Sequence, residues 1–170
     1  MTTAAHDLPA PADDAPRTTP RFDSLEQEVF LNLWRTYDRL RIQEDAFFAQ
    51  FDLTPQQYNV LRLLRAARPA TVPTLTLAER LVSRAPDITR MLDKLEERGL
   101  IVRERLADNR RVVRIGISDQ GVALLERIAE PLRECHARQL GHLAPDDLRR
   151  LCDLLRAARE PHEYGGSSWL

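Results

Sequence analysis

Two short segments of the chain alternate apolar and polar residues, whereas the regions around them repeat apolar residues with helical spacing. The segments Ile101–Leu106 and Arg111–Ser118 are rich in β-branched residues, so each predicts a strand with one buried face. Between them, residues 107–110 include Asp and Asn, which favour tight turns. The pattern therefore predicts a charged β-hairpin.

A helix from about Ala85 to Arg98 is predicted directly before this hairpin. Pro86 and Asp87 suit its first turn, and Gly99 suits its end. The apolar stripe of this helix consists of Ile88, Met91, Leu92 and Leu95, and its polar face of Asp87, Thr89, Arg90, Asp93 and Lys94. This division predicts a helix with one packed face and one face able to hydrogen-bond to base edges and phosphates.

A second short helix, from about Leu75 to Val82, precedes the first and is joined to it by Ser83 and Arg84. The predicted order is thus helix, turn, helix, hairpin. Modules with this order present their second helix to the major groove of DNA.

Three longer amphipathic helices flank these elements. The first begins at a cap on Asp23 or Ser24 and runs to about Gln50; the second begins at Ser118 and runs to about Leu140; the third covers Asp146–Arg159. The hairpin and the short helices before it cannot cover all of the apolar stripes on these longer helices. The sequence therefore predicts a partner surface for them.

The segment from Leu53 to about Leu125 resembles the DNA-binding core of the MarR family of bacterial transcription regulators. The resemblance is carried by Leu53–Tyr58, Leu77–Leu81, Asp87–Ile101, the wing signature Asp108-Asn109-Arg110, and Ile117-Ser118 with Gly121. The spacing from Asp108 to Gly121 is one residue longer than the family pattern. Arg110 and Arg111 are therefore both candidates for the minor-groove contact of the wing.

This resemblance implies a mainly α fold with a small β-hairpin wing, in which a winged helix-turn-helix core is joined to long N- and C-terminal dimerisation helices. It places the MarR-type domain at residues 22–160, with the winged lobe at about 53–121 and the dimerisation helices at 22–52 and 118–160. Residues 1–21, which hold four of the eleven prolines, are expected to be a disordered tail, and 161–170 a flexible one.

The resemblance implies a homodimeric repressor that binds double-stranded DNA at a pseudo-palindromic operator and releases it when a small effector, such as a phenolic or aromatic compound, binds. The DNA-contacting candidates are Arg84, Asp87, Thr89, Arg90, Lys94, Arg110 and Arg111. The segment from Arg80 to Arg114 carries ten basic and six acidic residues, whereas the whole chain has a net charge of -1. Positive charge is thus concentrated where phosphates would be met.

Other readings of these features stay open. A charged hairpin can simply be solvated, and a winged helix with acidic residues on its second helix can serve as a protein-interaction module. Trp34, Tyr37 and Phe48 are candidates for an effector pocket, but aromatic residues at helical spacing are usually core or interface.

The remaining chemistry points away from an enzyme, a cofactor or a metal site. The chain has no nucleophile paired with a base and no phosphate-binding loop, and His136 and His142 are six residues apart, so they do not form the i, i+4 pair that a metal favours. Cys135 and Cys152 fall in or beside apolar stripes, so packing is expected, with redox sensing as the alternative. No apolar run is long enough for a membrane helix and no secretory signal is visible, so a cytoplasmic protein is expected.

Overall fold

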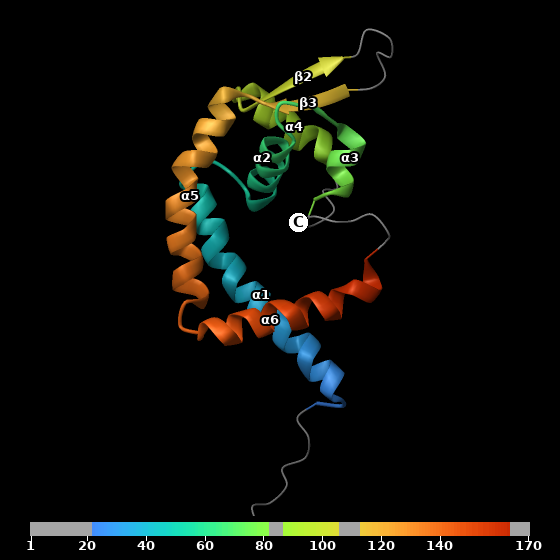
Figure 1. Ribbon diagram of the computed structural model, residues 1–170, viewed down its shortest axis with the longest axis vertical. Coiled ribbons are helices and arrows are strands. Elements are labelled where there is room, and N and C mark those ends of the chain that lie inside the picture. Colours follow the sequence, from blue (N-terminus) through green and yellow to red (C-terminus); the bar gives the residue numbers. More distant parts are fainter. Residues whose placement is uncertain (1–21, 82–86, 106–112, 164–170) are drawn as a thin grey trace, which may run out of the picture. The chain divides into compact units, whose positions relative to one another are not determined.

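The computed structural model describes residues 22–81, 87–105 and 113–163, which form helices and one small sheet (Figure 1). Along the chain these elements are α1 (Leu25–Ala49), α2 (Pro55–Ala67), β1 (Val72–Pro73), α3 (Thr74–Glu79), α4 (Ile88–Glu97), β2 (Ile101–Arg105), β3 (Val113–Ile117), α5 (Asp119–Leu140), α6 (Pro145–Arg159) and a 3-10 turn (Glu160–His162). The predicted fold class, mainly helical with a small winged sheet, is confirmed. The chain divides into two units, Met1–Asp38 and Arg39–Leu170, with the boundary inside α1.

Local sequence signals determine where several of these helices begin. Thr54 and Gln57 form a capping box at the start of α2, in which each side chain accepts a hydrogen bond from the other residue's backbone N–H. The predicted cap at Ser118 is confirmed, because its Oγ accepts from the N–H of Gly121 at 3.0 Å. At α1, Ser24 accepts from the N–H of Gln27 at 3.1 Å.

The α4 helix is shorter than the sequence predicted. It begins at Ile88, because Asp87 is its N-cap and accepts a hydrogen bond from the N–H of Arg90 at 3.0 Å. Its predicted first residues, Ala85 and Pro86, lie outside the described part of the chain. The helix ends before Gly99, which has a φ of +67° and thus the left-handed conformation that the predicted stop requires.

The α3 helix also ends earlier than predicted. Its last turn closes when the N–H of Arg80 donates to the carbonyl of Leu77, an i to i−3 bond that tightens the chain. The predicted end at Val82 and the linker at Ser83 and Arg84 lie outside the described residues.

The sheet contains a strand that the sequence did not predict. β3 pairs antiparallel with β2 on one side and with β1 on the other, with Arg103 and Val72 both opposite Ile115. β1 has only two residues, one of them Pro73, so it has no alternation that could identify it. The predicted strand ends at Leu106 and Arg111 lie outside the described residues, and β3 ends at Ile117, one residue before the predicted Ser118.

One apolar core lies within the unit Arg39–Leu170, between α2, α4, the sheet and α5. Its most deeply buried large side chains are Phe48, Val60, Leu61, Leu64, Leu77, Leu92, Leu95, Ile115 and Ile128. At the start of α5, a Cβ on Gly121 would lie 2.3 Å from the carbonyl oxygen of Leu100, so only glycine fits there. This close approach packs α5 directly against the segment between α4 and β2.

Two other helical faces remain exposed. The part of α1 before Asp38 exposes seven large apolar residues, namely Leu25, Val29, Phe30, Leu31, Leu33, Trp34 and Tyr37. Considered on its own, α6 has no buried residue and exposes Leu151, Leu154 and Leu155. None of the described helices is both long and apolar enough to cross a membrane.

Candidate nucleic-acid interface

The α4 helix divides into a packed face and a polar exposed face. Leu92 and Leu95 are buried in the core. Thr89, Arg90 and Lys94 are exposed, and Arg90 and Lys94 are four residues apart, so their side chains lie on the same side of the helix. This arrangement agrees with the predicted polar face and places two cations beside each other on it.

Asp87 contributes to this face in a different way from the one the sequence suggested. Its carboxylate caps α4, so the side chain is already hydrogen-bonded to the helix that it starts. The other three candidates, Arg84, Arg110 and Arg111, lie outside the described residues. The described part of the interface therefore consists of the exposed face of α4 and the two strands of the wing.

The strand β2 lies against α4 and contributes an arginine that sequence reasoning did not single out. The guanidinium of Arg103 lies 2.6 Å from a carboxylate oxygen of Asp93 and 3.1 Å from one of Glu96. A signal for this contact was present, because Arg103 follows the buried Ile101 at the period of two that puts both on one strand face.

Two further arginines of the basic segment are used inside the protein. Arg98, after α4, donates to the carbonyl of Phe51 at 3.1 Å and also to that of Asp52. Arg114, on β3, donates to the hydroxyl of Thr71 at 2.8 Å. Their acceptors are neutral, so the positive charge of the segment remains. Several of their donor groups, however, are already engaged within the lobe.

Comparison with known proteins identifies the family to which this arrangement belongs. The MarR family model matches residues 53–113. A MarR transcription factor from Planctomyces limnophilus is 52% identical, and the match covers 81% of this chain and 99% of that one with a TM-score of 0.65. The chain belongs to the MarR family.

Other relatives agree with this assignment. An uncharacterised HTH-type transcriptional regulator from Bacillus cereus is 33% identical over 107 residues, which are 63% of this chain and 69% of the relative. A mutant MarR from E. coli, solved in complex with operator DNA, is 22% identical, with 80% and 99% of the two chains covered and a TM-score of 0.68. The last likeness shows the fold alone. As a member of this family, the chain is a DNA-binding transcriptional regulator.

The three aromatic candidates for an effector pocket occupy two different environments in this MarR protein. Phe48 is only 1% exposed and packs on Tyr58, with ring centroids 4.8 Å apart. The same burial raises the pKa of the Tyr58 hydroxyl, and Arg62 and Arg65 oppose the rise. Phe48 is therefore a core residue, which was the alternative that the sequence left open.

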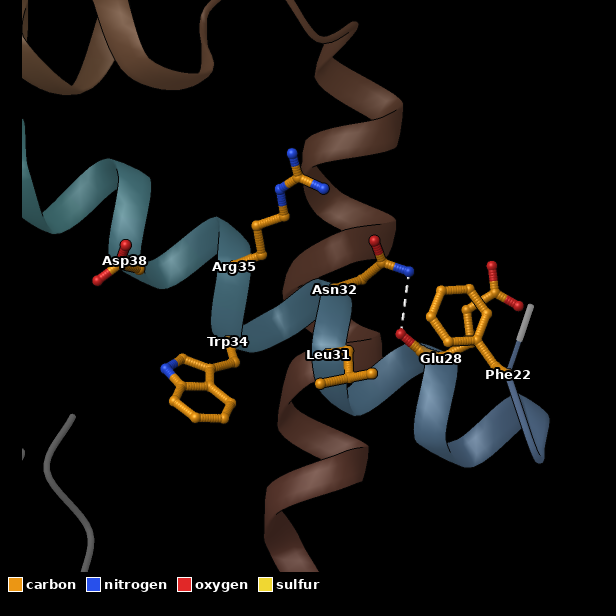
Figure 2. A pocket seen from close by; sticks show the side chains of 7 residues that line it. All are labelled: Phe22, Glu28, Leu31, Asn32, Trp34, Arg35 and Asp38. Carbon is orange, nitrogen blue, oxygen red and sulfur yellow. Dashed lines mark hydrogen bonds between the residues drawn. The ribbon is translucent and has the colours of Figure 1, made fainter.

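Trp34 and Tyr37 are 63% and 61% exposed and belong to the N-terminal unit. Trp34 lines a pocket of about 610 Å³, and Tyr37 is not among its lining residues. Besides Trp34, the pocket is lined by Phe22, Glu28, Leu31, Asn32, Arg35 and Asp38 (Figure 2). Arg35 offers the one basic group of this lining, while the amide of Asn32 is held by the carbonyl of Glu28 at 2.9 Å.

The two cysteines also differ. Cys135 is buried in the core, as the packing interpretation predicted, but Cys152 is exposed on α6. The expectation that Cys152 packs inside the chain was therefore wrong for this chain on its own, because α6 has no buried residue. Within the described ranges, no cluster of three or more His, Cys, Asp or Glu residues is placed to hold a metal ion.

Proposed function

We propose that this MarR-family regulator is a homodimeric repressor that binds a pseudo-palindromic operator through α4 and the wing. In this proposal residues 22–160 form the regulator, residues 53–121 form its DNA-binding lobe, and the protein acts in the cytoplasm. A small aromatic effector releases the DNA.

The observation that carries the DNA-binding mode is the composition of the exposed face of α4. Thr89, Arg90 and Lys94 offer donors at helical spacing, and two of the acidic residues of α4, Asp93 and Glu96, are paired with Arg103. Arg90 and Lys94 can then approach phosphates and the acceptors of guanine with the carboxylates of Asp93 and Glu96 already offset, although Glu97 remains exposed on their side of the helix. Arg84, Arg110 and Arg111 complete the proposed contacts, with either of the last two as the minor-groove contact of the wing.

The proposed dimer rests on the exposed apolar faces of α1 and α6. Exposed large apolar side chains that gather on one helix face are typical of interaction sites. A symmetric dimer would present two α4 helices to half-sites one DNA turn apart, which is why a pseudo-palindrome is proposed.

The effector part of the proposal rests on Trp34 and Tyr37, which are exposed on α1 and can stack on an aromatic ring. Arg35 also lines the pocket of Figure 2, although its side chain points away from the Trp34 ring, and its guanidinium would favour an effector with an acidic group. The effector would act by preferring a spacing of the two lobes that cannot match one turn of DNA.

Fluorescence anisotropy tests the DNA-binding mode on the protein's own upstream DNA and on scrambled DNA of equal length, over a range of salt concentrations. Arg90→Ala should lose about 1–3 kcal/mol of discrimination between the two, because a base contact is removed. Arg110→Ala should lower the salt slope by about one unit if it contacts phosphate or the minor-groove wall.

Arg133→Ala is the matched control, because it removes the same charge from a side chain on α5 that is 74% exposed. Arg133→Ala should change neither the discrimination between the two DNAs nor the salt slope, apart from a small loss of affinity that is equal for both DNAs. Equal, weak and strongly salt-dependent binding of the parent to both DNAs would contradict the proposal and favour the protein-interaction module. Failure of every small aromatic acid to change operator affinity would remove the effector alone.

A further inference from the structure

Arg103 occupies a position between the wing and the recognition helix. It lies on β2, opposite Ile115 of β3, so its backbone is held in the sheet. Its side chain is only 24% exposed and points to α4. There the Nη1 atom lies 2.6 Å from Oδ1 of Asp93 and 3.1 Å from Oε2 of Glu96, and Nη2 donates to the carbonyl of Thr89 at 3.4 Å.

The three partners of Arg103 share one side of α4. Thr89, Asp93 and Glu96 are separated by four and three residues, the spacing that places side chains above one another on successive turns. One guanidinium therefore holds two turns of the helix. The planar fork of arginine has several donors in fixed directions, so this contact restricts the angle between α4 and the sheet as well as their distance.

The contact also changes the electrostatics of the proposed DNA-binding face. Asp93 and Glu96 are close to half exposed and belong to the same helix as Arg90 and Lys94. Without Arg103, both carboxylates would repel phosphates that approach those two cations. The guanidinium offsets this repulsion at a distance from both carboxylates that is well within the Debye length of physiological salt.

Folding alone does not explain this arrangement. Ion pairs with partly exposed carboxylates contribute about 0–1 kcal/mol to stability, and α4 is already held by the burial of Leu92 and Leu95. The larger consequence of losing Arg103 would fall on DNA binding, where α4 and the wing must reach two grooves of one duplex at the same time.

We propose that Arg103 is a positioning residue for operator recognition. It acts through Thr89, Asp93 and Glu96, and it sets the angle between α4 and the wing while offsetting the two carboxylates. This proposal rests on the proposed function, because it concerns the same DNA-binding face.

Four variants test it on operator and scrambled DNA over a range of salt concentrations, with thermal unfolding measured in parallel. They are Arg103→Met, Arg103→Lys, Asp93→Asn with Glu96→Gln, and the triple variant that combines the last two changes with Arg103→Met. Arg103→Met should lower operator affinity more than scrambled affinity, so that their ratio falls by about tenfold, the size of one good base contact. Arg103→Lys keeps the positive charge but loses the planar guanidinium with its fixed donors. The affinity for scrambled DNA should therefore stay unchanged, while the ratio of operator affinity to scrambled affinity should still fall.

The triple variant separates charge from position. Removing the two carboxylates should restore scrambled affinity in the Arg103→Met background, but the ratio should stay low because nothing holds the angle of α4. Arg133→Met on α5 is the control and should leave the ratio unchanged.

The possible failures are distinguishable. A parent that does not discriminate between the two DNAs overturns the proposed function and the role of Arg103 with it. A parent that discriminates, with an unchanged ratio in both single Arg103 variants, overturns the positioning role alone. If the Arg103→Met protein does not fold, the ratio of operator affinity to scrambled affinity in Arg103→Lys tests the positioning role instead.

Discussion

Large apolar residues are buried in the winged lobe but exposed on the helical faces outside it. In the lobe, most leucines of α2 and α4 and the isoleucines of the sheet and α5 are almost completely buried, with the isoleucine at the start of α4 and Leu63 of α2 partly buried. On α6 and on the part of α1 before Asp38, large apolar side chains are exposed. The lobe is therefore complete within one chain, whereas the other two surfaces are suited to an interaction with another molecule.

The helix α1 shows this difference within one element. Phe48, near its end, is 1% exposed and packs on Tyr58, but Phe30 is 63% exposed and lies near Trp34 with ring centroids 6.2 Å apart. The same residue type thus serves as core at one end of the helix and as surface at the other. Helical periodicity alone does not distinguish the two roles.

The largest effect is expected from Phe48→Ala, which should lower the free energy of unfolding by about 3–5 kcal/mol at any protein concentration, because it leaves a cavity in the core. Its matched control is Phe30→Ala, which should change the unfolding of the isolated chain by less than about 0.5 kcal/mol. Urea unfolding at several protein concentrations measures both. An equal loss of unfolding free energy in the two variants at every protein concentration would contradict the assignment of Phe48 to the core and of Phe30 to the surface.

A second effect concerns the proposed dimer. Leu154→Asp puts a charge into the exposed apolar face of α6 and should raise the dissociation constant of the dimer at least tenfold, since a central interface residue contributes about 2 kcal/mol or more. Arg149→Ala makes the same change of net charge on this helix and should have little effect. Sedimentation velocity over a concentration series gives both constants. Unchanged association of Leu154→Asp would place the dimer contact elsewhere.

The smallest effect compares two helix caps. Ser118→Ala should lower the free energy of unfolding by about 1 kcal/mol, because its Oγ accepts from Gly121 and donates to the carbonyl of Gly99 at 2.6 Å. Ser24→Ala removes a similar cap at the exposed start of α1. It should lower the free energy of unfolding by less, since a helix end that is not packed in a core is already frayed. Thermal unfolding of both variants tests this order. A larger loss in Ser24→Ala would show that the N-terminal unit is held as firmly as the lobe.

Much of the lobe could be predicted from local sequence. The Ser118 cap, the stop at Gly99 and the apolar stripe of α4 follow from rules that act within a few residues, and the structure agrees with each of them. The exact start of α4 could not be predicted as well, because Asp87 suits both the cap and the first turn. Phe48 and Cys152 illustrate the same limit, since the sequence shows a stripe but not whether that stripe is covered.

The sequence by itself determined the type and order of the main helices and of the β2–β3 hairpin, the family and the polar face of α4, because periodicity, caps and motif spacing are local properties. Only the tertiary structure decided that β1 completes the sheet, that Arg98 holds the turn at Phe51 and Asp52, and that Arg103 joins the wing to α4. Each of these contacts joins residues that are distant in sequence or belong to different elements. Their partners are selected by packing of the whole lobe, which no local pattern records.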